Sequence, residues 1–217
     1  MKFLLIALTI VLGPALCRAQ SDDAAFDRIL TAAVEKLHSA KIMKMSVESR
    51  FVFAGRGDTT AANYYIVMER DDSLRPGCKL FGFTPRGLYY VYDGDRLLTG
   101  YPETGRMTEY RRGRIPMSLF WEGLPNWDLL PRPVNAQVMQ SVYDDAGSSN
   151  KSVRYGRLGK DSVIILSADR KGNEEVELGH FETHLRAADL VPLRCISKYD
   201  IEGEGQQYSE VTLNFVA

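Results

Sequence analysis

The chain has 217 residues, a formal net charge of −1 and nearly equal numbers of basic and acidic residues, 27 and 28. So balanced a charge gives no sign of a nucleic-acid partner or of an anionic membrane surface as the target. The length suits one domain with a sizeable core, and the sequence has no Cys-x-x-Cys pair that would indicate a redox enzyme.

Residues 1–19 have the pattern of a secretion signal, because Lys2 supplies a positive charge and an apolar run follows it. This run is about half of the roughly 20 residues that a membrane-spanning helix needs, and no later segment of the sequence is expected to span a bilayer. We expect cleavage after Ala19, which places the mature chain in the periplasm or outside the cell. The alternative is acylation of Cys17, but Leu16 stands where a lipoprotein motif requires a small side chain.

An amphipathic helix is predicted after this signal. Asp22 and Asp23 supply acidic side chains at its start, where the helix dipole favours negative charge. The apolar residues that follow recur at helical spacing and form one stripe, which consists of Phe26, Ile29, Leu30, Ala33, Val34 and Leu37. Charged side chains occupy the opposite face, so the helix is expected to lie on another apolar surface.

From Met43 onwards the apolar pattern has a period of two, which is typical of half-buried β-strands. Turn signals such as Asp93-Gly94 divide the chain into short strands, predicted over residues 43–53, 64–70, 79–83, 88–92, 97–101 and 107–110. A second group of strands is predicted nearer the C-terminus, over residues 153–158, 162–168, 176–186, 193–199 and 208–215. No helix separates successive strands within either group, so the sheet should be antiparallel.

The strand pattern stops over residues 115–146, between the two groups. Prolines prevent one long helix there, and the large apolar side chains include Met117, Phe120 and Trp121. A helical spacing of apolar residues near the end of this insert includes Tyr143. We therefore predict a mid-chain helical lid that is interrupted by proline.

Three short motifs connect these elements with a known family, and they are Arg75-Pro76, Tyr92-Asp93-Gly94 and Leu190-Val191-Pro192-Leu193-Arg194. In this order they resemble the LolA-like superfamily of periplasmic carriers of outer-membrane lipoproteins. The resemblance implies an α+β fold in which a strongly curved antiparallel sheet forms an open, incomplete β-barrel. It also implies one domain over residues 20–217, with an N-terminal helix and the mid-chain lid. The insert, rich in tryptophan and proline, looks closer to uncharacterised predicted periplasmic relatives than to the authentic carrier.

The carriers of this superfamily hold acyl chains and are not enzymes. The resemblance therefore implies a non-enzymatic periplasmic protein, without a cofactor, that binds a lipid or the acyl chains of a lipoprotein in an apolar cavity. Arg75 would act as a latch that hydrogen-bonds the lid, although an arginine before such a turn can equally be solvated. The alternative function is an envelope sensor or interaction domain of the same fold, which binds a protein partner and no lipid.

The predicted strands carry large apolar side chains on both faces, unlike a sheet with one wet face. One face can therefore line a cavity, or the helices can fill the barrel and leave no space. The candidate cavity lining is Phe51, Phe53, Tyr65, Val67, Phe81, Phe83, Tyr90 and Tyr92, and the candidate lid residues are Met117, Phe120 and Trp121. A period of two does not determine which alternate residues of each strand face inward.

Neither a catalytic nor a metal site is predicted. The sequence has no Gly-x-Ser-x-Gly nucleophile elbow. On a strand, His180 and His184 would stand roughly 13 Å apart, too far for one ion. Cys78 and Cys195 both lie in predicted strands. In an oxidising compartment they can form a disulfide, or they can remain two separate buried thiols.

Overall fold

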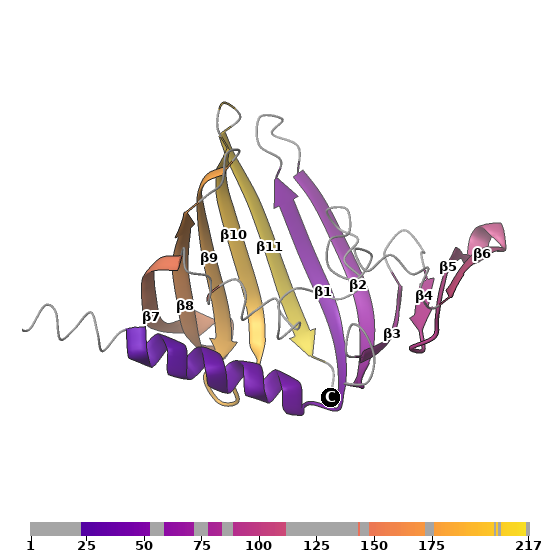
Figure 1. The fold of residues 1–217 in the computed structure, drawn as a ribbon, viewed down its shortest axis with the longest axis horizontal. Helices are drawn as coiled ribbons and strands as arrows, with labels where there is room; N and C mark the ends of the chain where they lie inside the picture. Colours follow the sequence, from indigo (N-terminus) through magenta and orange to yellow (C-terminus); the bar gives the residue numbers. More distant parts are fainter. Residues whose placement is uncertain are drawn as a thin grey trace, which may run out of the picture.

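An antiparallel sheet of eleven strands dominates the part of the chain that the computed structural model describes (Figure 1). The described residues are 23–52, 59–71, 78–83, 89–111, 143, 148–171, 176–201, 203 and 205–215. The first strands are β1 (Ile42–Val52), β2 (Thr59–Arg70), β3 (Cys78–Phe83), β4 (Tyr89–Tyr92), β5 (Arg96–Tyr101) and β6 (Arg106–Arg111), with a short 3₁₀ turn, η1 (Pro102–Thr104), between β5 and β6. The later strands are β7 (Ser148–Leu158), β8 (Asp161–Lys171), β9 (Val176–Arg186), β10 (Pro192–Ile201) and β11 (Gly205–Phe215).

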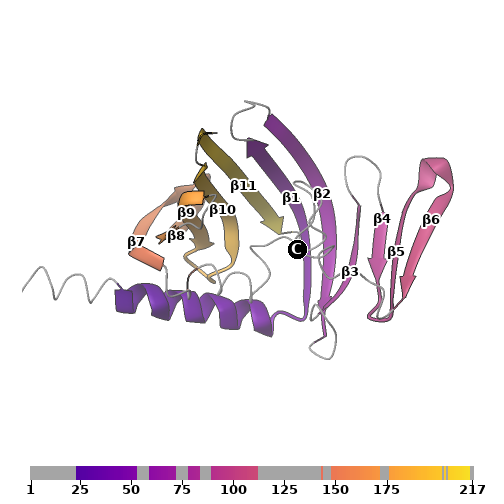
Figure 2. The same ribbon diagram turned by 45° about the horizontal axis from the view of Figure 1, so that its top comes forward.

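The sheet consists of two meanders that join at its centre. Its strand order is β6-β5-β4-β3-β2-β1-β11-β10-β9-β8-β7, so the first and last strands of the described chain are neighbours. Their pairing runs from Met45 opposite Phe215 to Val52 opposite Tyr208. The two strands that flank the insert, β6 and β7, therefore lie at opposite edges of the described sheet, which remains open (Figures 1 and 2).

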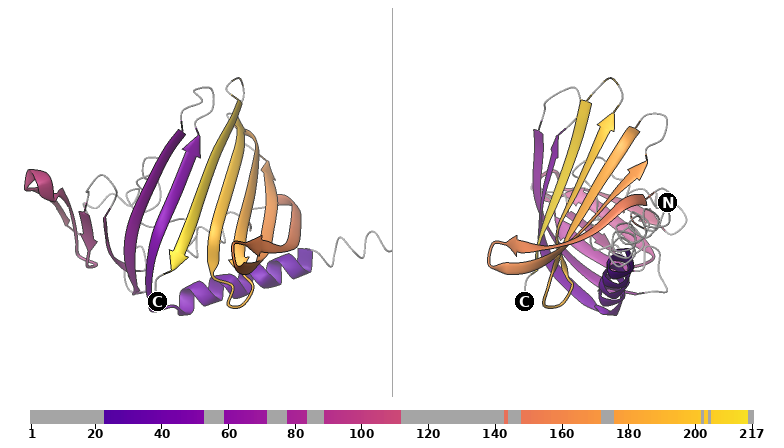
Figure 3. Two further views of the ribbon diagram at one scale, coloured as in Figure 1. Left: turned by 180° about the vertical axis from the view of Figure 1, so that it is seen from behind. Right: turned by 90° about the vertical axis from the view of Figure 1, so that its left-hand side faces the viewer.

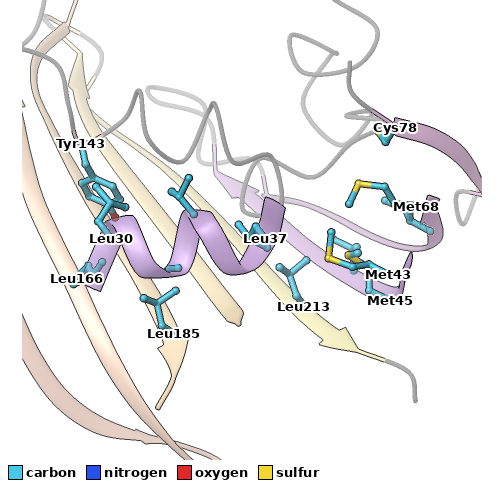
Figure 4. Packing of buried hydrophobic residues seen from close by; sticks show 14 of the residues in the cluster. Leu30, Leu37, Met43, Met45, Met68, Cys78, Tyr143, Leu166, Leu185 and Leu213 are labelled. Atoms are coloured by element: carbon cyan, nitrogen blue, oxygen red, sulfur yellow. The ribbon is translucent and has the colours of Figure 1, made fainter. Parts of the chain in front are cut away.

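The N-terminal helix, residues 23–39, crosses one face of this sheet below β7–β11 and ends beside β1 (Figures 1 and 3). Its predicted apolar stripe is buried, with Phe26, Leu30 and Leu37 between 0% and 3% exposed. Leu30 lies near Leu166 of β8 and Leu185 of β9 in the apolar cluster (Figure 4). The apolar stripe of the helix therefore packs against an apolar surface of the sheet, as the amphipathic pattern predicted.

Two basic side chains of the sheet hold the helix near its ends. Lys151 of β7 donates a 2.8 Å hydrogen bond from Nζ to Oδ1 of Asp27 and stands 5.3 Å from the ring centroid of Phe26. Arg70 of β2 donates a 2.8 Å hydrogen bond from Nη2 to the carbonyl oxygen of Leu37. The last carbonyls of a helix lack partners within the helix and carry partial negative charge, so a guanidinium suits this end.

The strand register determines which side chains share a face. We call the face that carries the helix the inner face, and the opposite one the outer face. One inner row crosses six strands through directly paired residues, which are Met43, Met68, Leu80, Tyr92, Leu97 and Tyr110. Because neighbours along a strand point to opposite faces, each residue beside a member of this row belongs to the outer face.

The predicted helix, both groups of strands and their antiparallel arrangement are confirmed, and so is the α+β fold with an open, curved sheet. The predicted lid over residues 115–146 lies outside the described residues except for Tyr143. Within the described ranges, no helix has the length and apolar character needed to cross a membrane.

Candidate functional site

The inner face carries a continuous apolar surface that extends past the end of the helix. Around the end of the helix lie three methionines, Met43, Met45 and Met68, which are 0–7% exposed (Figure 4). Leu80 and Leu97 continue the surface across β3 and β5 and are also buried. These last two strands lie beyond the end of the helix in Figures 1 and 2. The inner face is thus apolar over a wider area than the helix covers.

Two tyrosines belong to this surface and are positioned by neighbouring glycines. Tyr90 is paired with Gly82 across β3 and β4, and a Cβ atom at position 82 would collide with its hydroxyl group. Glycine therefore leaves the space in which the Tyr90 ring lies across the neighbouring strand. The hydroxyl of Tyr92 donates a 3.1 Å hydrogen bond to the carbonyl oxygen of Gly94. Both rings are almost fully buried, at 1% and 4% exposure.

Tyr143 anchors the end of the insert on the inner face. Its side chain is 1% exposed, and its ring packs edge-on against Phe26 of the helix with 5.2 Å between centroids. Its hydroxyl shares a 2.8 Å hydrogen bond with the hydroxyl of Thr183 on β9, which in turn lies 3.5 Å from the sulfur of Cys195. Burial raises the pKa of Tyr143 well above its ordinary value, so this hydroxyl remains neutral.

The register divides the candidate cavity lining between the two faces. Tyr90 and Tyr92 belong to the inner face, and the half-buried Phe51 shares the alternation of Met45 on β1. Tyr65 and Val67 point to the outer face, because their neighbours Ile66 and Met68 point inward. Phe81 and Phe83 are also on the outer face, 43% and 39% exposed. The other predicted site residues lie outside the described residues, and they are Phe53, Arg75, Met117, Phe120 and Trp121.

Several inner-face residues were not among the candidates, and they are Met43, Met45, Val47, Ile66, Met68, Leu80 and Leu97. On β1 the signal was present, since Met45 and Phe51 alternate with charged residues. On β3 the signal was weaker, because Leu80 and Phe81 are adjacent and both are large and apolar. Cys78 lies two residues before Leu80 and so shares its face of the strand. Because cysteine is among the most frequently buried residue types, Cys78 indicates that this face is the buried one.

Cys78 and Cys195 are both free thiols. They lie on β3 and β10, which are separated in the sheet by β2, β1 and β11. Adjacent strands are about 4.8 Å apart, whereas a disulfide needs Cα atoms within about 7 Å. Burial raises the pKa of each thiol to about 12, and for Cys78 the nearby charge of Arg70 acts against this rise. Cys78 behaves as a small apolar side chain of the core, whereas Cys195 is only partly buried.

A polar network occupies the outer face of β7–β10. Nδ1 of His180 lies 2.6 Å from Oδ1 of Asp169, and Nε2 of His184 lies 3.3 Å from Oε2 of Glu182. Arg154 donates a 2.7 Å hydrogen bond to Oε1 of Glu182. Among the described residues, no three metal-ligating side chains are placed to hold one ion.

The environment of this network lowers the pKa of three of its members, and for Asp169 the main cause is the hydrogen bond with His180. Burial lowers the pKa of His184 below its ordinary value, and the charges of Arg194 and Arg154 act in the same direction, against its hydrogen bond with Glu182. Burial would raise the pKa of Glu182, but hydrogen bonds from His184 and His180 and the charge of Arg154 outweigh it. A neutral imidazole beside an ionised carboxylate is therefore the stable state near neutral pH.

The sequence matches no protein-family model and no curated protein. Solved structures match over most of the chain. The lipoprotein LppX from Mycobacterium tuberculosis has 9% identity and a TM-score of 0.52, covering 88% of this chain and 94% of that one. LprF from Mycobacterium bovis has 9% identity and a TM-score of 0.50, covering 90% and 95%. A LolA superfamily protein, NE2245 from Nitrosomonas europaea, has 11% identity and a TM-score of 0.42, covering 87% and 90%.

The described sheet and helix share the fold of LppX and LprF. The resemblance drawn from the sequence motifs is thus confirmed at the level of the fold. Identities of 9% show the fold alone and leave the ligand to be argued from the residues of this chain.

Proposed function

We propose that this protein is a non-enzymatic envelope protein that binds a lipid, or the acyl chains of a lipoprotein, on the inner face of its sheet. The observation that carries the proposal is the apolar row from Met43 on β1 to Leu97 on β5, which continues past the end of the helix at residue 39. In this proposal the signal pattern of residues 1–19 directs the protein to the periplasm or out of the cell.

The chemistry of the inner face supports an acyl chain as the ligand. The row offers thioether and hydrocarbon side chains, and methionine adapts its shape to a flexible neighbour. Each buried methylene group contributes about 0.8 kcal/mol. Ten methylene groups would then contribute about 8 kcal/mol, which corresponds to a Kd near 1 μM. An acyl chain of ordinary length therefore needs only part of this surface.

The position of the insert supports a cover over the same surface. The chain leaves the sheet at β6 and returns at β7, which are opposite edges of the described sheet. Just before β7, Tyr143 is anchored between the helix and β9. In the proposal, Met117, Phe120 and Trp121 of the insert cover the acyl chain, and Arg75 remains the candidate latch. Phe51, Phe53, Tyr90 and Tyr92 complete the lining.

Displacement of a fluorescent fatty acid from the mature protein tests this function with a matched pair of variants. Met68→Trp places a large ring on the inner face, whereas Val67→Trp places the same ring on the outer face of the same strand. We expect Met68→Trp to weaken binding about tenfold or more, while Val67→Trp binds like the wild type. Phe120→Asp should also weaken binding, because it places a charge against the acyl chain.

Two results would contradict the proposal. A folded wild-type protein that binds no fatty acid and carries no co-purified lipid by mass spectrometry would favour the alternative, a domain that binds a protein partner. Equal binding by the wild type and Met68→Trp would place the ligand elsewhere. Thermal unfolding of both tryptophan variants provides the control, since overpacking a filled core costs about 1–3 kcal/mol.

A further inference from the structure

The outer face of β2–β6 carries a second apolar surface, which we call the outer patch. It consists of Tyr65, Phe81, Phe83, Tyr89, Val91 and Met107. Five of these side chains are the large hydrophobic groups that the sheet exposes in this region, from 38% for Val91 to 57% for Met107. Contiguous exposed apolar side chains on a soluble protein usually mark a contact surface.

The strand register brings these residues into continuous contact. Tyr65, Phe83 and Tyr89 are paired across three neighbouring strands, and their ring centroids are 5.9 and 5.7 Å apart. The next residue in this row is Gly100, where a Cβ atom would collide with the sulfur of Met107. The absence of a side chain at Gly100 therefore leaves room for Met107, which forms the end of this row on β6. Phe81 and Val91 are directly paired beside it.

Three ion pairs flank the outer patch. Their nitrogen–oxygen distances are 2.9–3.7 Å, and the pairs are Lys79 with Glu69, Arg96 with Asp93, and Arg111 with Glu109. Each pair contains one positive and one negative group, so together they present no net charge. Charges that are already paired in this way offer a strongly charged partner little to complement, so these pairs favour an electrically neutral partner surface.

The size of the outer patch argues against a second copy of the chain as a stable partner. From β2 to β6 it spans four strand spacings, about 19 Å, and its two rows are about 7 Å apart along the strands. Such an area amounts to a few hundred Å², whereas a stable protein interface buries about 800 Å² on each partner. Tyrosine combines an apolar ring with a polar tip, which suits the boundary between lipid and water.

We propose that the outer patch docks this protein on the surface of a lipid bilayer with zwitterionic, electrically neutral headgroups. The aromatic rings enter the boundary between headgroups and acyl chains, and the flanking ion pairs remain in water. This docking does not depend on the proposed acyl site, because the two surfaces lie on opposite faces of the sheet.

Flotation of the mature protein with phosphatidylethanolamine–phosphatidylcholine vesicles tests the docking. The double variant Phe81→Ser/Phe83→Ser removes the exposed rings, and Met107→Glu adds a charge while leaving the stacked rings in place. The matched control is Tyr155→Ser, which removes a 77% exposed aromatic side chain from β7 at the far edge of the sheet. We expect the wild type and Tyr155→Ser to float, and both patch variants to bind about tenfold less.

Several outcomes would overturn the proposal. They are a wild type that does not float, patch variants that float like the wild type, and flotation that needs anionic lipid and disappears at high salt. A concentration-dependent dimer in sedimentation equilibrium that is lost in the double variant would make a second copy the occupant. Thermal unfolding shows whether the double variant is folded. If it is not, the flotation of Met107→Glu alone tests the docking. Flotation of Met68→Trp separates this docking from acyl binding, since that variant should float normally.

Discussion

The contact between Tyr143 and β9 can be tested by a double-mutant cycle. Tyr143→Phe keeps the ring against Phe26 but removes the hydroxyl that bonds to Thr183 at 2.8 Å. Among the described residues, the Thr183 hydroxyl then retains the thiol of Cys195, a weak partner 3.5 Å away. A buried hydrogen bond of this kind contributes about 1 kcal/mol, so we expect the free energy of unfolding to fall by about 1 kcal/mol.

Thr183→Val forms the second arm of the cycle. Valine has nearly the same shape, but it leaves the Tyr143 hydroxyl in its buried site without this partner, at a cost of about 1–3 kcal/mol. The double variant lacks both hydroxyl groups, so neither is left buried without its partner. It should therefore be less destabilised than the sum of the single variants, by about 1 kcal/mol or more.

Urea unfolding followed by circular dichroism measures all three variants. Tyr155→Phe is the control, because its ring is 77% exposed and its change should stay within about 0.5 kcal/mol. Additive losses in the double variant, within about 0.5 kcal/mol, would show that the two hydroxyls do not interact in solution. Tyr143 would then not be seated on β9, and the argument that the insert is anchored at this point would fail.

The remaining predictions concern pH and thiol reactivity. Since folding lowers the pKa of His184 below 6.5, the unfolded chain takes up this proton first, and stability should fall as the pH drops below about 6.5. The lowered pKa of Glu182 adds a second loss below about pH 4.5. In urea unfolding across this range His184→Gln should remove the upper loss, and a stability that rises on acidification would refute the reasoning. Burial raises the pKa of Cys78 and Cys195 to about 12, so Ellman's reagent near pH 8 should label them slowly before unfolding and rapidly after it. Fast native labelling of Cys78 would disprove its burial.

The positions of the elements could be predicted because they depend on local periods. The helical stripe from Phe26 to Leu37 repeats with the turn of a helix, and all the predicted strands are found within a few residues of their expected bounds. The short motifs, such as Tyr92-Asp93-Gly94, then connected this order of elements with the LolA-like fold. Turn and period signals arise from neighbouring residues, so no long-range contact is needed to recognise them.

The candidate site could be predicted only in part, because a strand with apolar residues on both faces is ambiguous. Phe81 and Leu80 are neighbours on β3, yet Leu80 is 2% exposed and Phe81 is 43% exposed. The exposed fractions of these two side chains differ because Leu80 is paired with Met68 and Tyr92 in the inner row. Shifting the register by one residue would exchange the two faces.

The sequence by itself determined where the helix and strands lie, that successive strands are antiparallel, and that one helix face must be covered. Tertiary structure alone decided which strand parity faces that helix, which strands became neighbours at the centre of the sheet, and where Tyr143 attaches. The reason is that alternation along a strand is a local property, whereas the choice of face follows from pairing with residues distant in the chain, such as Met45 with Phe215.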